Sequence, residues 1–182
     1  NFDSLSDQTV TVATADNDSA GFTVTQSGGS TQVNEAESTD TFTVVLCAEP
    51  ASDVVISVTS GDTGEATVSA SSLTFTSSNW DSAQTITVTG VDDDIIDGSI
   101  NSTVTLAVVD GSSDDNFDSL SDQTVTVATA DNDSACFTVT QSSGSTAVSE
   151  SGSTDTFTVV LTAEPDSNVV ISVTSGDTGE AT

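Results

Sequence analysis

Carboxylates are the side chains of this sequence with the clearest chemical potential, and they gather in short runs. Asp92-Asp93-Asp94 is followed closely by Asp97, and Asp131-Asn132-Asp133 forms a second run. The full sequence holds 29 Asp and Glu but no Lys, Arg or His, so its formal charge is −29. Without cationic side chains the chain can form no internal side-chain salt bridge, and its like charges destabilise the compact state. External cations are therefore the expected counter-charge.

The nature of these ligands favours calcium. Ca²⁺ takes about 6–8 oxygen ligands at ~2.3–2.6 Å and tolerates irregular geometry, whereas Mg²⁺ requires a tighter octahedron. The absence of His and the presence of only two Cys argue against zinc or copper. Nucleic acid is excluded as a partner, because binding phosphates requires Lys and Arg, and an anionic membrane surface is disfavoured for the same reason.

Nothing in the sequence indicates an enzyme. There is no His or Lys to act as a base, no pair of carboxylates in an apolar setting and no nucleophile motif. No segment approaches the ~18 apolar residues of a membrane span, so we expect no membrane insertion in this part of the chain.

The elements that must position these carboxylates recur along the chain. Residues 116–182 repeat residues 1–67 with only nine differences, which gives a period of 115 residues. A period of this length corresponds to one domain per repeat. We expect residues 1–19 (the leading segment) to be the C-terminal strand of a preceding repeat and residues 20–134 to be a complete repeat. Residues 135–182 (the trailing segment) would then be the N-terminal half of a following repeat, in a window on a much longer protein.

Short Val- and Thr-rich runs with period-two alternation predict an all-β fold. Phe42, Val44 and Leu46, for example, alternate with Thr41, Thr43 and Val45, as in a half-buried strand. Gly-, Ser- and Asp-rich turns separate such runs at regular spacing, which predicts tandem antiparallel β-sandwich domains of the immunoglobulin-like kind. The expected strands are 21–26, 31–35, 40–47, 53–59, 67–76 (interrupted), 83–90, 100–109 and 121–130.

Consecutive strands of such a sandwich run in opposite directions, so alternate loops gather at opposite ends. If 21–35 counts as the first strand, one end collects four acidic segments, and the next repeat must leave from that same end. These segments are the turn at Glu35, the loop at Asp62, the loop from Asp92 and the exit at Asp131 to Asp133.

The acidic loop and the exit carry a family resemblance. Asp92-Asp93-Asp94-Ile95-Ile96-Asp97, after Gln84 to Thr89, resembles the signature of Calx-β domains, as does Val125 to Asp133. The stretch Leu73 to Trp80 is similar to a version common in giant bacterial surface proteins and adhesins. The resemblance implies a seven-stranded sandwich that binds calcium at the acidic end. The ligands it implies are Glu35, Asp62, Asp92, Asp93, Asp97, Asp131, Asn132 and Asp133, with Asn132 standing where the family usually has Asp.

Several residues have a structural alternative. Asp62 is as well explained by capping its own turn as by binding a cation. Trp80 is expected to plug one edge of the sandwich, with carbohydrate stacking as the alternative. A further acidic group, Asp114, Asp115, Asp118 and Asp122, is expected to be a solvated stretch.

The two cysteines fall in different repeats. Cys136 occupies the repeat position of Gly21, and Cys47 that of Thr162. Positions 21 and 47 should be neighbours if the first two long strands pair, but neither repeat has Cys at both. The thiols are therefore either free or linked between chains staggered by one repeat.

These observations predict a structural calcium-binding repeat of a long extracellular surface protein, either an adhesin extender or a filament body stiffened by Ca²⁺ at the domain junctions. Its partners would be calcium, neighbouring repeats of the same chain and other copies of itself in a filament. The alternatives are a calcium-sensing regulatory module and a glycan- or ligand-binding sandwich domain. Near-identical repeats favour the spacer, because a sensor needs only one or two distinct modules.

Overall fold

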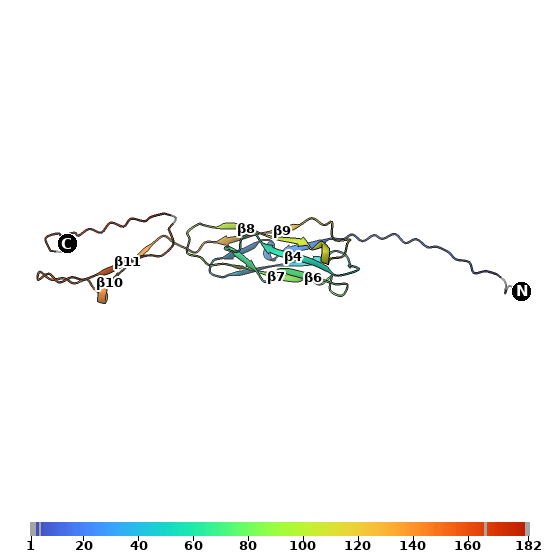
Figure 1. Cartoon of the computed structure of the whole chain (residues 1–182), viewed down its shortest axis with the longest axis horizontal. Helices are drawn as coiled ribbons and strands as arrows, with labels where there is room; N and C mark the ends of the chain where they lie inside the picture. Colours follow the sequence, from blue (N-terminus) through green and yellow to red (C-terminus); the bar gives the residue numbers. More distant parts are fainter. Residues whose placement is uncertain (1–2, 4, 166, 181–182) are drawn as a thin grey trace.

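The computed structural model describes residues 3, 5–165 and 167–180. The complete repeat forms two sheets, the leading segment runs extended from one end of them, and the trailing segment continues from the other end (Figure 1). Positions 1–2, 4, 166 and 181–182, which belong to the leading and trailing segments, lie outside the described residues. The assignment of these segments to neighbouring repeats stays a prediction.

Nine strands make up the complete repeat, and each lies close to a predicted one. Alternation explains them: Phe42, Val44 and Leu46 are at most 3% exposed, whereas their neighbours along the strand are partly exposed. The strands are β1 (Phe22–Gln26), β2 (Thr31–Asn34), β3 (Thr39–Leu46), β4 (Val54–Ser60), β5 (Ala66–Val68), β6 (Ser72–Phe75), β7 (Gln84–Gly90), β8 (Ile100–Val108) and β9 (Gln123–Ala130).

The strands form two sheets that confirm the all-β sandwich. One sheet has the order β1-β3-β7-β5, and the other has the order β2-β9-β8-β4-β6. The interruption predicted within 67–76 is a change of sheet, because β5 pairs with β7 and β6 pairs with β4. One pair departs from the antiparallel pattern: β2 runs parallel to β9.

The parallel pair arises because the first strand passes from one sheet to the other. Between β1 and β2 the chain makes a short 3₁₀ turn, η1 (Ser27–Gly29), in which Gly28 and Gly29 have φ of 60° and 86°. Positive φ is readily adopted only by glycine. The Asp40 carboxylate accepts hydrogen bonds from the Ser27 hydroxyl and, at 2.9 Å, from the Gln32 N–H. These bonds fix the crossover.

The core lies between the two sheets and is built from the inward side chains of both. Phe42 and Ile86 from one sheet and Ile56, Phe75 and Leu106 from the other are fully buried. Burying one such side chain contributes about 1.5–3 kcal/mol. At one edge Trp80 packs partly buried against this core, in agreement with the expected plug.

The acidic stretch after β8 is not simply solvated, and the prediction for Asp114 is wrong. Asp114 is 5% exposed, and its Oδ2 accepts the N–H groups of Ala51 (2.6 Å) and Ser52 (3.1 Å). Its Oδ1 accepts the Asn116 N–H, and these bonds hold the pKa of Asp114 below its ordinary value. Asp114 therefore ties together the loops after β3 and after the 3₁₀ turn η2 (Asp110–Ser112). Asp118 is half-buried, while Asp115 and Asp122 are exposed as expected.

The leading and trailing segments copy parts of this domain without its full set of neighbours. In the trailing segment β10 (Phe137–Gln141) pairs with β11 (Phe157–Leu161) in the register of β1 with β3, around the 3₁₀ turn η3 (Ser142–Gly144). In the leading segment Val10 is 87% exposed, whereas its copy Val125, held between β2 and β8, is 1% exposed. Among the described residues, no helix has the length and apolarity that crossing a bilayer requires.

Candidate metal centre

The parallel pairing of β2 and β9 brings two carboxylates together. Asn34 lies opposite Ala130 in this register, so Glu35 and Asp131 follow at the same end of adjacent strands. The Glu35 N–H continues the ladder by donating to the Ala130 carbonyl at 3.2 Å. Carboxylate oxygens of Glu35, Asp131 and Asp133 all lie within 4.8 Å of one another. These three residues are the centre of what we call the carboxylate pole.

Glu35 is buried at this pole, with 1% of its surface exposed. Its Oε2 accepts the Asn132 N–H at 2.9 Å. The close approach of Gly90 makes room for this strand end, because a Cβ at Gly90 would lie 2.1 Å from the Asn34 carbonyl oxygen. The position of the buried carboxylate therefore depends on a glycine in another strand.

The acidic loop, residues 91–98, closes over the exit of the domain. The Gly98 N–H donates to Asp131 Oδ2 at 2.8 Å, and Asn132 Nδ2 donates to Asp92 Oδ1 at 3.0 Å. The Asn132 amide thus serves here as a donor to the loop. Within the loop, Asp93 Oδ1 accepts the Ile95 N–H at 2.8 Å.

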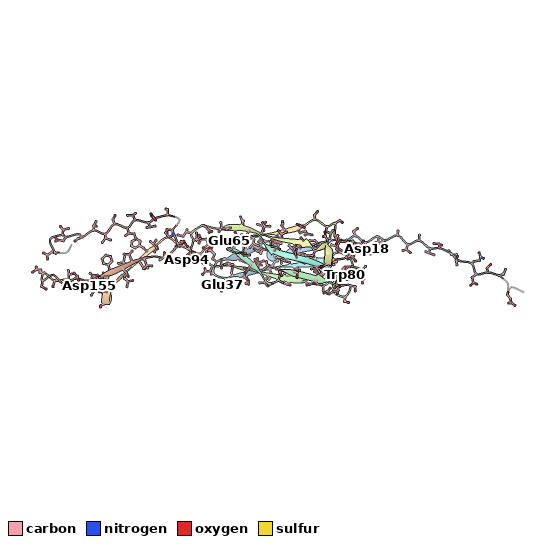
Figure 2. All side chains as sticks on the ribbon, viewed as in Figure 1. Asp18, Glu37, Glu65, Trp80, Asp94 and Asp155 are labelled. Carbon is pink, nitrogen blue, oxygen red and sulfur yellow. The ribbon has the colours of Figure 1, made fainter. Side chains whose placement is uncertain are left out.

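A second buried glutamate, Glu65, belongs to this pole and is not among the residues predicted from sequence. It is 8% exposed, and its carbonyl accepts the Val91 N–H at 2.9 Å where the acidic loop begins. Its Oε2 has no hydrogen-bond partner among the described residues. Figure 2 shows Glu65 and Asp94 at the end of the sandwich that faces the trailing segment, with Trp80 at the other end. The sequence signal that could have identified Glu65 is its position: it is an acidic residue directly before a short strand, next to the loop of Asp62.

Asp62 itself has a local role. Its Oδ1 accepts the Gly64 N–H at 3.0 Å within the turn, which is the capping arrangement expected of such an aspartate. Its charge is nevertheless close enough to raise the pKa of Glu65. One carboxylate oxygen of Asp62 is therefore already engaged by its own turn.

Burial and like charge set the protonation of the pole. Burial raises the pKa of Glu35, as do the charges of Asp131, Asp93 and Asp97, while the bond from Asn132 N–H opposes the rise. Burial, followed by the charge of Asp97, likewise raises the pKa of Glu65.

The two exit aspartates respond in opposite directions. Burial and the neighbouring Asp131 raise the pKa of Asp133. The N–H groups of Asp133 and Gly98 lower the pKa of Asp131, because they donate to its charged form. The pole therefore holds one carboxylate stabilised as an anion beside several that resist ionisation.

The donor set fits a hard cation. Glu65 Oε2 and Asp133 Oδ2 are both buried without a partner among the described residues, and a buried polar atom without a partner is costly. All side-chain donors at the pole are oxygens, contributed by separate segments. Ca²⁺ accepts such a set. It would supply the positive charge that the sequence lacks. Glu35, Asp131 and Asp133 would hold it, and the charges of Glu65 and the acidic loop would act on it from nearby.

Comparisons with known proteins find distant structural neighbours. Neither the models of known protein families nor the curated protein sequences contain a match. Among solved structures the chain is similar to the E. coli chaperone DraB, with 8% identity over 63% of this chain and 56% of that one and a TM-score of 0.41. It is also similar to the apo form of the Calx CBD1 domain (13% identity, 62% of this chain and 98% of that chain, TM-score 0.39). CBD12 from CALX1.2 is a third (12% identity, 60% and 44%, TM-score 0.38).

The chain thus spans little more than half of the chaperone that it matches. Calx CBD domains are among its structural neighbours. Similarity at this distance carries no information about what this chain binds.

Proposed function

We propose that the complete repeat binds Ca²⁺ at the carboxylate pole and that the protein is a non-catalytic structural element built from such repeats. One observation carries the proposal. Glu35, Asp131 and Asp133 converge within 4.8 Å beside the unpartnered buried oxygen of Glu65, in a chain without a single Lys, Arg or His. A bound divalent cation would remove the repulsion among these groups.

The wider setting that we propose is an extracellular array, serving as the extender of an adhesin or the body of a surface filament. The near-identity of residues 1–67 and 116–182 supports a repeated spacer over a sensor. Extracellular calcium modules work with dissociation constants of about 10⁻⁴–10⁻³ M, which suits a partly exposed site. The carboxylate pole also lies where the chain leaves the domain, so an ion there would stiffen the junction.

Thermal unfolding in calcium and in chelator tests the binding. A ligand that binds only the folded state adds about 2.7 kcal/mol at a hundred-fold excess over its Kd. The single tryptophan, Trp80, lies in the complete repeat, so its fluorescence follows that domain. We expect the melting temperature to rise clearly with calcium.

The matched variants are Glu35→Gln at the pole and Asp81→Asn, an exposed carboxylate outside the pole. Glu35→Gln should weaken the calcium response, whereas Asp81→Asn should keep it. Equal melting temperatures of the unmodified chain in calcium and in chelator would exclude the proposed function.

A further inference from the structure

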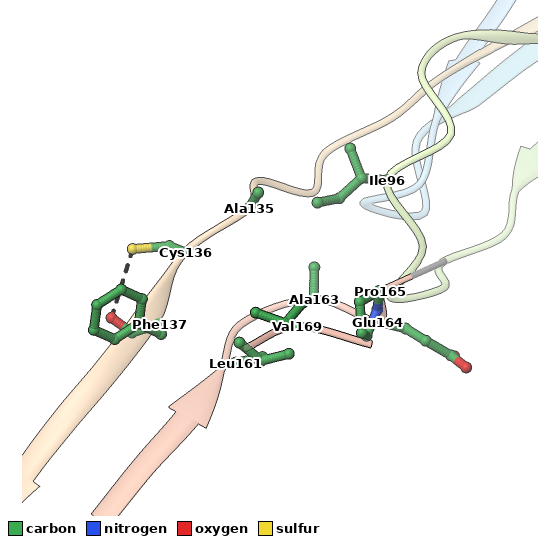
Figure 3. Close-up of a pocket in the computed structure, with 9 residues that line it drawn as sticks. All are labelled: Ile96, Ala135, Cys136, Phe137, Leu161, Ala163, Glu164, Pro165 and Val169. Carbon is green, nitrogen blue, oxygen red and sulfur yellow. Dashed lines mark hydrogen bonds between the residues drawn. The ribbon is translucent and has the colours of Figure 1, made fainter. Parts of the chain in front are cut away.

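The acidic loop has a second side, which contacts the trailing segment. The Asp94 carbonyl accepts the Glu164 N–H at 2.6 Å, and Ile95 forms a parallel bridge with Glu164. Ile96 lies across from Ala163 and Pro165, on the wall of an apolar hollow of about 330 Å³ (Figure 3). The Glu164 side chain points away from this hollow, so the contact uses its backbone. One three-residue segment thus combines a hydrogen bond with an apolar contact.

The complete repeat carries part of the same receiving surface. Ala48-Glu49-Pro50 has the sequence of Ala163-Glu164-Pro165, and Ala20 has that of Ala135. Ala20, Ala48 and Glu49 line a separate hollow of about 240 Å³ at the end of the sandwich opposite the carboxylate pole. The Glu49 N–H, the counterpart of the donor to Asp94, makes no hydrogen bond within the described part of the chain. This part of the surface is therefore present in the complete repeat, and its hydrogen-bond donor, the Glu49 N–H, has no acceptor among the described residues.

Part of the hollow at the trailing segment belongs to a domain core. Phe137 and Leu161 line it, but their copies Phe22 and Leu46 are 6% and 3% exposed in the complete repeat. What remains at the surface of a complete repeat is Ala48 and Glu49 together with Ala20, because Pro50 is buried there. The docking surface is accordingly formed by these three residues, and its area is small.

We propose that Asp94-Ile95-Ile96 is a docking segment that seats on the Ala-Glu-Pro turn of the following repeat and fixes the angle between the two. We infer that the turn at Ala48 binds a second copy of this same docking segment. Ile95 and Ile96 are 38% and 40% exposed, so they do not belong to the core of their own domain. Contact with the following repeat would explain why two apolar side chains lie at the tip of an otherwise acidic loop.

The docking segment also links the junction to the carboxylate pole. Asp92, Asp93 and Asp97 flank Asp94 to Ile96 in the same loop, and the loop is tied to Asp131 through the Gly98 N–H. A cation that orders these carboxylates would order the docking segment. This coupling rests on the proposed function, whereas the contact itself does not.

Distance measurement between two spin labels on the full chain tests the contact. One label is attached to Cys47 in the complete repeat, and the other to the thiol introduced by Thr140→Cys in β10. The substitution Cys136→Ser removes the remaining thiol. Cys47 and Thr140 are both exposed. We expect a narrow distance distribution. The double change Ile95→Ser with Ile96→Ser should lose the narrow peak, whereas Val109→Ser, at a residue of matched exposure (38%), should keep it.

A second pair of variants leaves the complete repeat untouched. Glu164→Pro deletes the N–H that bonds to Asp94 and should broaden the distribution, while Glu164→Ala retains the N–H and should not. Trp80 fluorescence should show the same unfolding transition in all of these proteins. Distributions as narrow in Glu164→Pro as in Glu164→Ala, or unchanged by the two serines, would overturn the docking segment.

Calorimetry with calcium separates this inference from the proposed function. If no calcium binds, the proposed function fails, yet the comparison of the isoleucine and Glu164 variants still decides the contact. If calcium binds but leaves the distribution unchanged, the contact stands and its coupling to the ion is wrong.

Discussion

Glu35 and Glu65 are glutamates held in the folded repeat where ionisation is unfavourable. The pKa of each is raised above its ordinary value of 4.5, first of all by burial. A raised folded-state pKa means that the group stabilises the fold when protonated and that this contribution is lost as the pH rises through the raised value. The stability of the domain should therefore depend on pH in opposite ways with and without calcium.

In chelator, we expect the free energy of unfolding to fall as the pH rises above 4.5, the ordinary pKa of these glutamates, and through their raised values. Calcium binds the deprotonated carboxylates, so its stabilising effect should grow over the same interval. Urea unfolding followed by Trp80 fluorescence at a series of pH values measures both trends. Glu35→Gln combined with Glu65→Gln should reduce both trends, and a flat profile in the unmodified chain would contradict the burial argument.

The neighbouring positions 21 and 47 offer a second test at the residue scale. The Cys47 N–H donates to the Gly21 carbonyl at 2.8 Å, which confirms that these positions are neighbours. A Cβ at Gly21 would lie 3.6 Å from the Cys47 Cβ, within the range of a disulfide. In the structure both native cysteines are free and exposed.

Gly21→Cys should therefore form a disulfide with Cys47 and raise the free energy of unfolding by about 3 kcal/mol in the absence of reductant. The gain should disappear in reductant, because it comes from restricting the unfolded chain. Gly21→Ser is the matched control and should show no dependence on reductant. Mass spectrometry of the unreduced protein reports whether the bond has formed.

At the scale of elements, the crossing of β2 over the end of β7 positions the buried carboxylate. Gly90 closes β7, and its N–H donates to the Ser38 carbonyl at 3.0 Å, in the turn that follows Glu35. The Asn34 backbone sits so close that any side chain at position 90 would displace it. Because Glu35 follows Asn34 directly, such a displacement would also move Glu35, one of the three carboxylates at the centre of the carboxylate pole.

Gly90→Ala should accordingly lower the free energy of unfolding by about 1–3 kcal/mol, the usual cost of overpacking. It should also reduce the rise in melting temperature on adding calcium. Gly111→Ala is the control, because a Cβ there meets nothing within 4 Å and the glycine has no positive φ. If the Gly90→Ala and Gly111→Ala variants have the same free energy of unfolding, β2 can move away from position 90 more easily than the structure shows.

On the scale of the whole molecule, the carboxylate pole lies at the end of the complete repeat that faces the trailing segment, where Figure 2 labels Glu65 and Asp94. Asp131 and Asp133 belong to the connection itself, and Ser134-Ala135 is too short to act as a flexible linker. An ion bound there should hold the two parts in line.

Small-angle scattering should give a larger maximum dimension in calcium than in chelator. Replacing Asp131 and Asp133 by Asn should shorten the particle even in calcium, because the exit loses two charges that a cation would bridge. The matched control replaces Asp115 and Asp122, both exposed, by Asn. If the maximum dimension is the same in calcium and in chelator, the ion stabilises the domain but does not fix the geometry of the junction.

Sequence alone determined the strands, since alternation along Phe42, Val44 and Leu46 is a local property of the chain. It also determined which loops are acidic and that no internal cation can neutralise them. Most of the pole followed from the alternation of strand direction. Glu35, Asp131 and Asp133, predicted from distant parts of the chain, do converge.

Tertiary structure decided the parallel pairing of β2 with β9, the inclusion of Glu65 and the burial of Asp114. Each depends on contacts between segments far apart in sequence: Glu65 meets the start of the acidic loop at Val91, and Asp114 meets the turn at Ala51. Local composition reports whether a segment is polar, and there both residues look like ordinary loop acids. Whether a carboxylate is solvated or buried is set by the backbone that packs around it, and that backbone comes from elsewhere in the chain.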